Sequence, residues 1–187
     1  MSQHISSHRI ISPSDPLTAK VKALYYESFP IEEQRPWSST MNLISDPDSQ
    51  FRLIALTLPD ESFAGFVTIW EIDGFRYIEH FAVDPSMRGN GIGAEILESL
   101  KHDDPKPLLL EVEPPETGEM ASRRIGFYKR CGFMLHDDIP YMQPPYSPGL
   151  PPVRLMLMST APIPTPSATI ATLHSKVYGI TPKLTAP

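Results

Sequence analysis

Hydrophobic residues recur along this chain with two different spacings, and each spacing predicts a type of secondary structure. Short runs rich in Phe, Ile, Val and Tyr are separated by turn residues, a pattern typical of β-strands. The dipeptide Asp73-Gly74 is a strong hairpin signal, so the strands around it are antiparallel. The predicted strands cover residues 8–12, 51–58, 63–72, 75–83, 107–112, 133–135 and 153–158.

Other segments repeat their apolar residues every three or four positions, which predicts amphipathic helices. The first begins after Ser14-Asp15-Pro16, where Ser or Asp serves as the cap and Pro lies in the first turn. It ends before Pro30. The remaining predicted helices cover residues 37–44, 91–102, 120–131 and 167–178.

This order of elements predicts one parallel crossover inside a mostly antiparallel sheet. The expected fold class is therefore α+β, with a mixed central sheet flanked by helices. Eleven of the 22 prolines lie from Pro140 onward, so we expect no long regular elements there. We divide the chain into a domain of residues 1–159 and a Pro/Thr-rich extension of residues 160–187. Three placements are open for the short helix of the extension: it docks on its own domain, it reaches a neighbouring subunit, or it stays disordered.

Composition narrows the class of protein. The 187 residues are 41% hydrophobic and 20% charged, as in a soluble globular protein, and the net charge of −6 argues against binding to nucleic acid or an anionic membrane. No apolar run is long enough to span a bilayer, and the N-terminus lacks the apolar core of a signal peptide. The only cysteine, Cys131, forms no internal disulfide and fits a cytoplasmic location. The six histidines show no metal-binding spacing, so we expect no metal.

The segment of residues 81–97 carries the strongest functional signal. A strand ends at Val83, Asp84-Pro85 interrupts it, and a glycine-rich stretch opens a helix. Glycines allow backbone N–H groups to approach an anion, and the start of a helix adds unpaired amides and partial positive charge. An arginine adds donors suited to phosphate. The segment therefore indicates a pyrophosphate site built by Arg88, Gly89, Asn90, Gly91, Ile92 and Gly93.

Two alternatives to this site remain open. The glycines could form a plain surface turn with an exposed arginine. Gly89-x-Gly91-x-x-Ala94 also satisfies a dinucleotide-binding pattern, with Glu111 at a suitable distance for a ribose contact. Two features oppose a dinucleotide: five residues separate that pattern from the end of the strand, and antiparallel strands precede it.

The stretch VDPSMRGNGIGAEIL resembles the acetyl-CoA motif R/Q-x-x-G-x-G/A of the GNAT (Gcn5-related N-acetyltransferase) superfamily, with Arg88, Gly91 and Gly93 at its defining positions. The stretch IGFYKRCGF, residues 125–133, resembles the later signature of the same superfamily. The resemblance covers residues 8–158. It departs from the family where Ala121 and Arg124 replace the usual Asn and Ala, which puts the usual contact to the pantetheine arm in question.

The resemblance implies an acetyl-CoA-dependent N-acetyltransferase in which an amine attacks directly in a ternary complex. It places the cofactor along the backbone of Phe81, Ala82 and Val83 and on the glycine-rich loop. It also assigns Tyr128 as the acid that protonates the CoA sulfur; a packing role is the alternative. We favour Glu79 as the general base, with Glu111, Glu113 or water left open. Strand alternation places His80 on the face opposite Glu79, in a structural role.

Several features bear on the partners. The basic residues Arg123, Arg124, Lys129 and Arg130 form either a solvated helix face or a counter-charge for the CoA 3′-phosphate. By resemblance, the first helices and the loop at residues 30–37 shape the acceptor site, with the Tyr- and Pro-rich segment 141–152 beside it. The acceptor is a small-molecule or peptide amine, and a homodimer is possible. The competing function is a non-catalytic acyl-CoA-binding or regulatory domain whose C-terminal arm binds a protein. The acceptor-side candidates are Tyr25, Tyr26, Phe29, Glu32 and Glu33.

Overall fold

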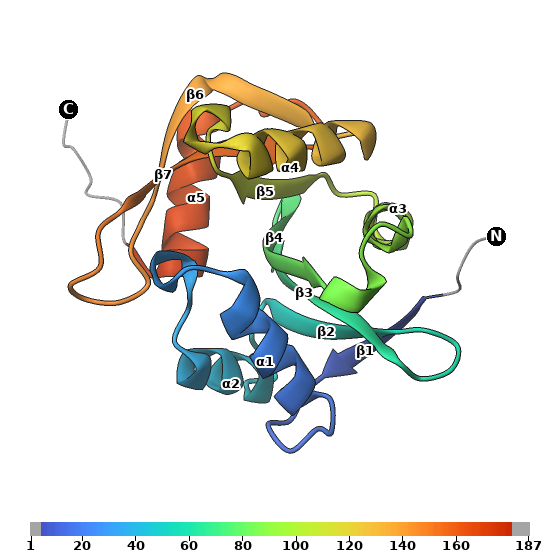
Figure 1. The fold of residues 1–187 in the computed structure, drawn as a ribbon. Helices are drawn as coiled ribbons and strands as arrows, with labels where there is room; N and C mark the ends of the chain where they lie inside the picture. Colours follow the sequence, from blue (N-terminus) through green and yellow to red (C-terminus); the bar gives the residue numbers. More distant parts are fainter. Residues whose placement is uncertain (1–4, 181–187) are drawn as a thin grey trace.

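The computed structural model describes residues 5–180 and contains one seven-stranded sheet of order β1-β2-β3-β4-β5-β7-β6 (Figure 1). β4 and β5 are parallel, and all other neighbours are antiparallel. The expected α+β class is therefore confirmed. The strands are β1 Ser6–Ile10, β2 Phe51–Thr57, β3 Phe63–Ile72, β4 Phe75–Val83, β5 Leu108–Val112, β6 Met134–Gln143 and β7 Val153–Ser159.

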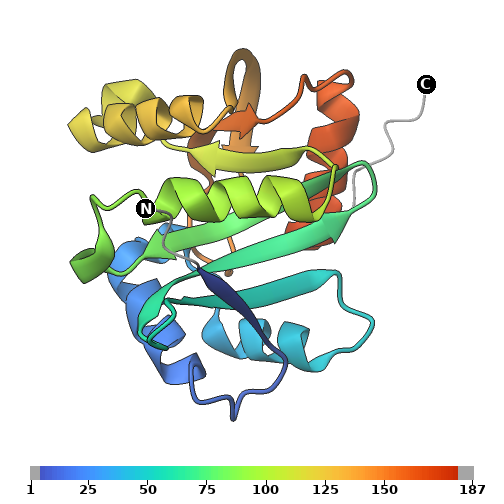
Figure 2. The same ribbon diagram turned by 90° about the vertical axis from the view of Figure 1, so that its right-hand side faces the viewer.

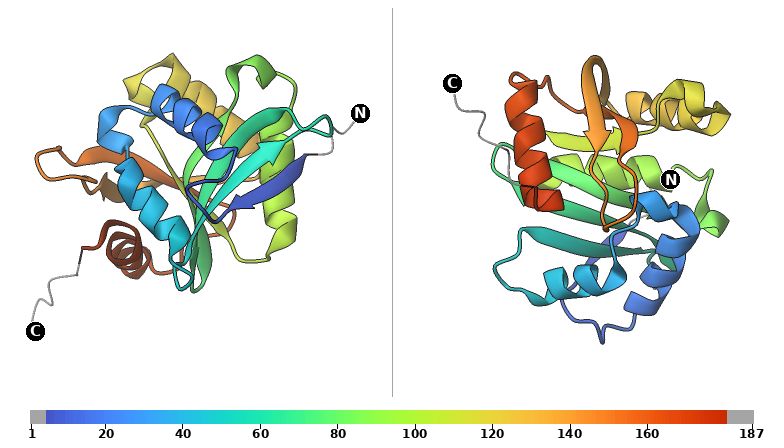
Figure 3. Two further views of the ribbon diagram at one scale, coloured as in Figure 1. Left: turned by 90° about the horizontal axis from the view of Figure 1, so that it is seen from below. Right: turned by 90° about the vertical axis from the view of Figure 1, so that its left-hand side faces the viewer.

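Five α-helices in residues 5–180 cover the two faces of the sheet (Figures 2 and 3). One face packs against α1, α2 and α5, and the other packs against α3 and α4. Both faces bury a continuous apolar cluster, because each strand alternates its side chains between them. The helices are α1 Thr18–Ser28, α2 Trp37–Ser45, α3 Ile92–Asp103, α4 Glu119–Arg130 and α5 Pro166–Tyr178.

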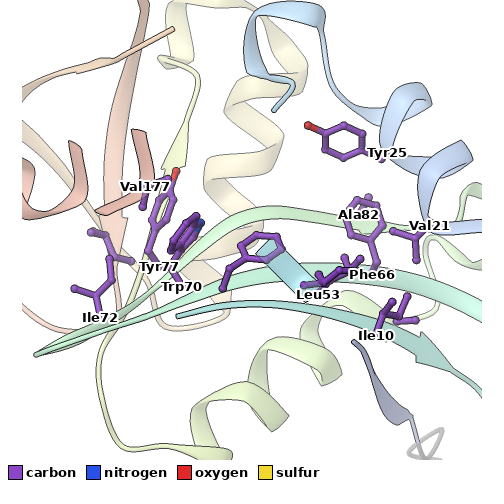
Figure 4. Close-up of a cluster of buried hydrophobic side chains, with 14 of the residues drawn as sticks. Ile10, Val21, Tyr25, Leu53, Phe66, Trp70, Ile72, Tyr77, Ala82 and Val177 are labelled. Carbon is purple, nitrogen blue, oxygen red and sulfur yellow. The ribbon is translucent and has the colours of Figure 1, made fainter. Parts of the chain in front are cut away.

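The last helix, α5, packs on the sheet of its own domain. Leu173 and Val177 are buried in the same cluster as the sheet residues Trp70 and Tyr77. Figure 4 shows Val177 beside Tyr77. The boundary expected between residues 159 and 160 falls at the end of β7, and the segment beyond it adds a helix to the same core. Of the three placements expected for this helix, the structure shows docking on its own domain; residues 181–187 lie outside the described part of the chain.

The two parallel strands β4 and β5 separate along their length. They pair only through Arg76 with Leu108, Tyr77 with Leu109 and Ile78 with Leu110, although β4 continues to Val83. Figure 2 shows the two strands diverging toward their C-terminal ends. This divergence leaves one side of the second half of β4 without a strand partner in the sheet.

A β-bulge lies where β4 and β5 begin to separate. Thr68 pairs with His80 while the next residue, Ile69, pairs with Ile78, so Glu79 is the extra residue of β4. The extra residue breaks the strict alternation of side chains. Glu79 and His80 consequently point to the same side, with His80 Nδ1 3.8 Å from a Glu79 carboxylate oxygen. The expectation that His80 faces away from Glu79 is wrong for this reason.

Strand β6 is longer than predicted. The sequence predicts a strand at residues 133–135, and β6 extends to Gln143. It contains Pro140 and has an irregularity between His136 and Tyr141. β6 is an edge strand that pairs only with β7, and an edge strand tolerates a proline because one side of it needs no hydrogen bonds. Proline at this end of the chain therefore interrupts the pairing without ending the strand.

Candidate active site

The divergence of β4 and β5 opens a cleft of about 770 Å³. Its walls are the second half of β4, the start of α3, the end of β5, α4 and the loop between β6 and β7. Every predicted cofactor-binding residue except Asn90 lines this cleft, as do Tyr128 and the candidate bases Glu79, Glu111 and Glu113. Of the acceptor-side candidates, Phe29 and Glu33 line it and Tyr25, Tyr26 and Glu32 do not.

The glycine-rich loop has a shape that suits an anion. Asp84 Oδ1 accepts hydrogen bonds from the backbone N–H of Ser86 at 2.9 Å and from its hydroxyl at 2.6 Å, which fixes the turn after β4. Gly89 and Gly91 have φ of +84° and +79°, a conformation that favours glycine. A Cβ at either position would meet no atom within 4 Å, so these peptide groups are open to a ligand. The loop therefore fits a pyrophosphate.

The start of α3 adds further groups that suit an anion. Gly91 is the N-cap residue; the N–H groups of Ile92 and Gly93 precede the first hydrogen bond of α3, and that of Ala94 donates to the Gly91 carbonyl at 3.0 Å. Arg88 donates from Nε to the carbonyl of Val83 at 3.0 Å, which ties its side chain to the end of β4. A Cβ on Gly93 would lie 3.2 Å from the ring of Phe127, a tight contact, so glycine here lets α3 pack against Phe127 of α4 without displacing that ring. Asn90 lies in the glycine-rich loop, between Gly89 and Gly91.

Tyr128 comes from α4 and is buried, with 8% of its surface exposed. Its ring contacts the rings of Phe127 and Phe133, with centroids 5.2 and 5.5 Å away. Burial raises the pKa of Tyr128 to about 12, against a smaller lowering effect of Arg124. The phenol is thus protonated at neutral pH and lines the cleft, so it can donate a proton there.

The basic residues of α4 divide into different roles. Arg123, Arg124 and Arg130 line the cleft, and Lys129 does not. Arg124, which replaces the family's usual alanine, forms an ion pair with Glu113, and Arg123 forms one with Glu119 at 2.6 Å. Arg124 therefore ties α4 to the end of β5 at the cleft wall.

Glu79 lines the cleft, and three other side chains hold its carboxylate. Arg35 donates to Oε1 from two nitrogens at 2.6 and 3.0 Å, Trp70 donates to Oε2 at 3.0 Å, and Tyr146 donates to Oε1 at 2.8 Å. The carboxylate has no exposed surface. Burial acts to raise its pKa, but Arg35 and the hydrogen bonds outweigh burial, so the pKa of Glu79 lies below its usual value.

Arg35 is itself enclosed. Its guanidinium lies 5.3 Å from the ring of Trp70 and 4.9 Å from the ring of Tyr146, and it donates to the carbonyl of Val177 at 2.7 Å. This one side chain therefore links the loop before α2, the sheet, the loop after β6 and the end of α5.

Glu111, at the end of β5, has a different environment from Glu79. Tyr178 donates to its two carboxylate oxygens, each 3.2 Å away, and Tyr141 donates to Oε1. Burial raises the pKa of Glu111 to about 7, although the hydrogen bonds from Tyr141, Tyr77 and Tyr178 act to lower it. In the described part of the chain no arginine or lysine forms an ion pair with Glu111.

His80 connects β4 to β3 and to the loop after α1. Its Nε2 lies 2.9 Å from the carbonyl of Glu33 and must donate to it, so Nδ1 accepts from the hydroxyl of Thr68 at 3.2 Å. Burial lowers the pKa of His80, which keeps the ring neutral. Its ring also packs on Phe29 with centroids 4.7 Å apart. These contacts agree with the structural role expected for His80.

Arg35, Tyr146 and Tyr178 are site residues that the sequence did not single out. Each lies in a segment that the sequence analysis describes: the loop at residues 30–37, the Tyr- and Pro-rich segment 141–152 and the predicted helix 167–178. Two carboxylates in apolar strands were a signal, because such groups need buried partners. Nothing in the sequence indicated which cation and which hydroxyls those partners are.

Metal binding and membrane insertion both bear on the class of site. Within residues 5–180, no group of three or more His, Cys, Asp or Glu side chains is arranged to hold a metal ion. The same residues contain no helix of the length and apolar character needed to cross a membrane.

Comparison with known proteins agrees with this geometry. The sequence model of the Acetyltransferase (GNAT) family matches residues 18–133. A solved GNAT-family structure from Bacteroides thetaiotaomicron is 36% identical, with a TM-score of 0.84 over 94% of this chain and 99% of that one. The Bacillus subtilis (strain 168) protein YjbC, which carries the name of an acetyltransferase, is 29% identical over 62% of this chain and only 57% of its own length. This chain belongs to the GNAT acetyltransferase family.

The fold extends to more distant proteins. The spermidine N-acetyltransferase of Vibrio cholerae, solved in complex with CoA and spermine, has a TM-score of 0.59 at 13% identity. The match covers 83% of this chain and 94% of that one. At that identity the likeness shows a shared fold alone.

Proposed function

We propose that this protein is an acetyl-CoA-dependent N-acetyltransferase that transfers the acetyl group to an amine in a ternary complex. The observation that carries the proposal is the cleft between the diverging strands, which has an anion-binding loop at one end and buried carboxylates at the other. The end with Arg88 and the α3 N-terminus suits a pyrophosphate, and the opposite end suits a cationic amine.

Cofactor binding is proposed on this chain's own groups. Gly89, Asn90, Gly91, Ile92 and Gly93 offer backbone N–H groups to the pyrophosphate, and Arg88 adds charge. Phe81, Ala82 and Val83 lie on the part of β4 that has no β5 partner, so their backbone can bind the pantetheine arm. Bound there, acetyl-CoA supplies the acetyl group.

The catalytic assignments are part of the same proposal. Tyr128 donates a proton to the leaving sulfur from its position in the cleft wall. Glu79, predicted as the base, remains a candidate. Its three hydrogen-bonding partners and its lowered pKa make it a weak proton acceptor, and they favour a role in holding Tyr146.

The acceptor is proposed as a small or peptide amine. Glu33 lines the cleft, and burial together with the nearby Glu113 raises its pKa to about 7. The competing function, an acyl-CoA-binding domain with a partner-binding arm, is less favoured because α5 is occupied in its own core. A homodimer and a cytoplasmic location, the latter resting on the single cysteine, remain predictions.

The test is a turnover assay with acetyl-CoA and a panel of primary amines: spermidine, tyramine, glucosamine and a lysine-containing tetrapeptide. We expect CoA thiol release that depends on one class of amine, with the acetylated product identified by mass spectrometry. Tyr128→Phe should lower kcat by about a hundredfold and leave acetyl-CoA binding unchanged. Tight binding of acetyl-CoA with no turnover of any amine would instead support the non-catalytic alternative.

A further inference from the structure

Four tyrosine hydroxyls and two carboxylates form one hydrogen-bonded network on the acceptor side of the cleft. The hydroxyl of Tyr178 lies 3.4 Å from that of Tyr146, 3.3 Å from that of Tyr77 and 3.2 Å from both oxygens of Glu111. We propose that three members of this network form a proton relay, in which Tyr146 takes a proton from the acceptor amine and Tyr178 passes it to Glu111. The proposal rests on the proposed acetyltransferase function.

Tyr146 is placed to touch the acceptor. It lines the cleft from the loop between β6 and β7. Its ring packs against two neighbours: the guanidinium carbon of Arg35 lies 4.9 Å from the ring centroid, and the centroid of the Tyr178 ring lies 5.0 Å from it. Its hydroxyl reaches Glu79 at 2.8 Å and Tyr178 at 3.4 Å. A hydroxyl has one proton and two lone pairs, so the Tyr146 oxygen can accept from an amine, and its one proton, which points to Glu79 at rest, turns to Tyr178 to be passed onward.

Of the two carboxylates that the network connects, Glu79 is the poorer proton acceptor. Arg35 and Trp70 already donate to its two oxygens, and the cation stabilises its charged form. A proton that arrived there would weaken the buried ion pair, which is unfavourable. Glu79 is therefore a positioning residue that orients Tyr146.

Glu111 is the better proton acceptor. Tyr77 faces it from β4, Tyr141 from β6 and Tyr178 from α5, and the charge of Glu79 on β4 acts on it. These hydroxyls solvate the carboxylate without adding positive charge. Burial raises its pKa to about 7, so it is ready to gain or lose a proton near neutral pH.

The proton balance of the relay is simple. The attacking nitrogen loses one proton to the Tyr146 oxygen as the N–C bond forms. Tyr146 turns its own hydroxyl proton from Glu79 to the Tyr178 oxygen and donates it there, and Tyr178 donates its proton to a Glu111 oxygen. Both tyrosines end neutral and Glu111 ends as the carboxylic acid. Glu111 lines the cleft, so it can return the proton to water after product leaves.

The relay gives the C-terminal helix a function. Tyr178 is the last residue of α5, and Arg35 holds that end of the helix through the Val177 carbonyl at 2.7 Å. The segment beyond β7 thus supplies the middle member of the relay.

The first test measures Glu111 directly and needs no acceptor. Because the pKa of Glu33 is also raised to about 7, infrared spectra are recorded between pH 5 and 9 on the Glu33→Gln variant, in which the buried carboxyl that still titrates near pH 7 should be Glu111. In this background the signal should vanish when Glu111→Gln is added and persist when Glu79→Gln is added. The relay is excluded if Glu33→Gln shows no such signal, or if adding Glu79→Gln removes it while adding Glu111→Gln retains it.

The second test is the pH dependence of kcat, measured at saturating acetyl-CoA with the panel amine that is turned over fastest. Wild-type kcat should rise through about pH 7 to a plateau. Glu111→Gln should abolish this rise, and both Glu111→Gln and Tyr178→Phe should lower the plateau by about a hundredfold.

Tyr141→Phe is the matched control, because Tyr141 also donates to Glu111 but does not connect it to Tyr146. Its loss removes a hydrogen bond that lowers the pKa of Glu111, so the rise in kcat should move to higher pH while the plateau stays within about threefold. Equal losses of plateau rate in Tyr141→Phe and Tyr178→Phe would overturn the relay. If the wild type acetylates no amine while the infrared signal is present, the proposed function fails and Glu111 is only a buried titrating group.

Discussion

Replacing Arg35 by methionine should destabilise the fold strongly at neutral pH and less at acidic pH. The side chain of Arg35 is 12% exposed and that of its partner Glu79 is 0% exposed, so the substitution leaves a buried carboxylate without its cation. Methionine has a similar length and keeps most of the apolar packing. Trp70 and Tyr146 still donate to the carboxylate, but neither carries a charge.

The expected size of the effect comes from the burial of the pair. Removing one partner of a buried ion pair costs about 3–5 kcal/mol of stability, because the remaining charge has lost both water and its partner. The guanidinium also loses its contacts with two aromatic rings, each worth about 0.5–1 kcal/mol or more when desolvated. We therefore expect the free energy of unfolding at pH 7 to fall by at least about 3 kcal/mol.

The dependence on pH follows from the pKa of Glu79. In the wild type the pKa of Glu79 is lower in the folded state than in the unfolded state. Its carboxylate therefore stabilises the fold above the unfolded-state pKa, and this stabilisation is lost as the pH falls through the folded-state pKa. Without Arg35, burial raises the folded-state pKa of Glu79 above the unfolded-state value, so stability is instead lost as the pH rises through the folded-state pKa. The deficit of Arg35→Met relative to wild type should therefore be smaller at pH 5 than at pH 7.

Urea denaturation at pH 7 and pH 5 measures both effects. The double variant Arg35→Met/Glu79→Gln should be more stable than Arg35→Met alone at pH 7, because it carries no buried charge. Arg154→Met is the matched control, since Arg154 pairs with Glu116 at the surface and exposed pairs contribute little. A deficit below about 1 kcal/mol, typical of a surface pair, or an equal deficit at the two pH values, would refute the account of this ion pair.

Two further predictions concern the elements that frame the cleft. Gly65→Ala should destabilise the protein by about 1–3 kcal/mol or more in urea denaturation, because the new Cβ would lie 2.3 Å from the Ala82 carbonyl oxygen; unchanged stability would show that β3 and β4 are not this close. Arg76→Met should lower the thermal midpoint and increase amide exchange at the end of α3, because the buried Arg76 donates to the carbonyls of Leu100 and Asp104 there; unaltered exchange in α3 would contradict that capping role.

The fold and the position of the glycine-rich loop in the cleft were predictable from the sequence because their signals are local. A strand that ends at Val83 and a glycine-rich stretch that opens a helix are neighbours in the chain, and so are the residues around Tyr128. The hairpin at Asp73-Gly74 is local as well. Each element needs only a few adjacent residues to be recognised, so the structure agrees with most of these predictions.

The acceptor side could be predicted only in outline because its partners are far apart in the chain. Arg35 and Glu79 are 44 residues apart, and Tyr178 and Glu111 are 67 apart. The bulge at Glu79 depends on how β4 pairs with β3, and no turn or periodicity in β4 reveals it. Strict alternation consequently placed His80 on the wrong face. Carboxylates in apolar strands indicated that partners exist, but only the folded chain identifies them.

The central claim, that the cleft binds acetyl-CoA for transfer, is tested most directly by calorimetric titration of the wild-type protein with acetyl-CoA, NAD and NADP in parallel. We expect binding of acetyl-CoA alone, weakened at least tenfold in Arg88→Glu and unchanged in Arg9→Glu, which alters an exposed arginine on β1. A concentration of 100 times the Kd should also stabilise the fold by about 2.7 kcal/mol. Binding of NAD without acetyl-CoA, or of none of the three, would contradict the assignment of this cleft.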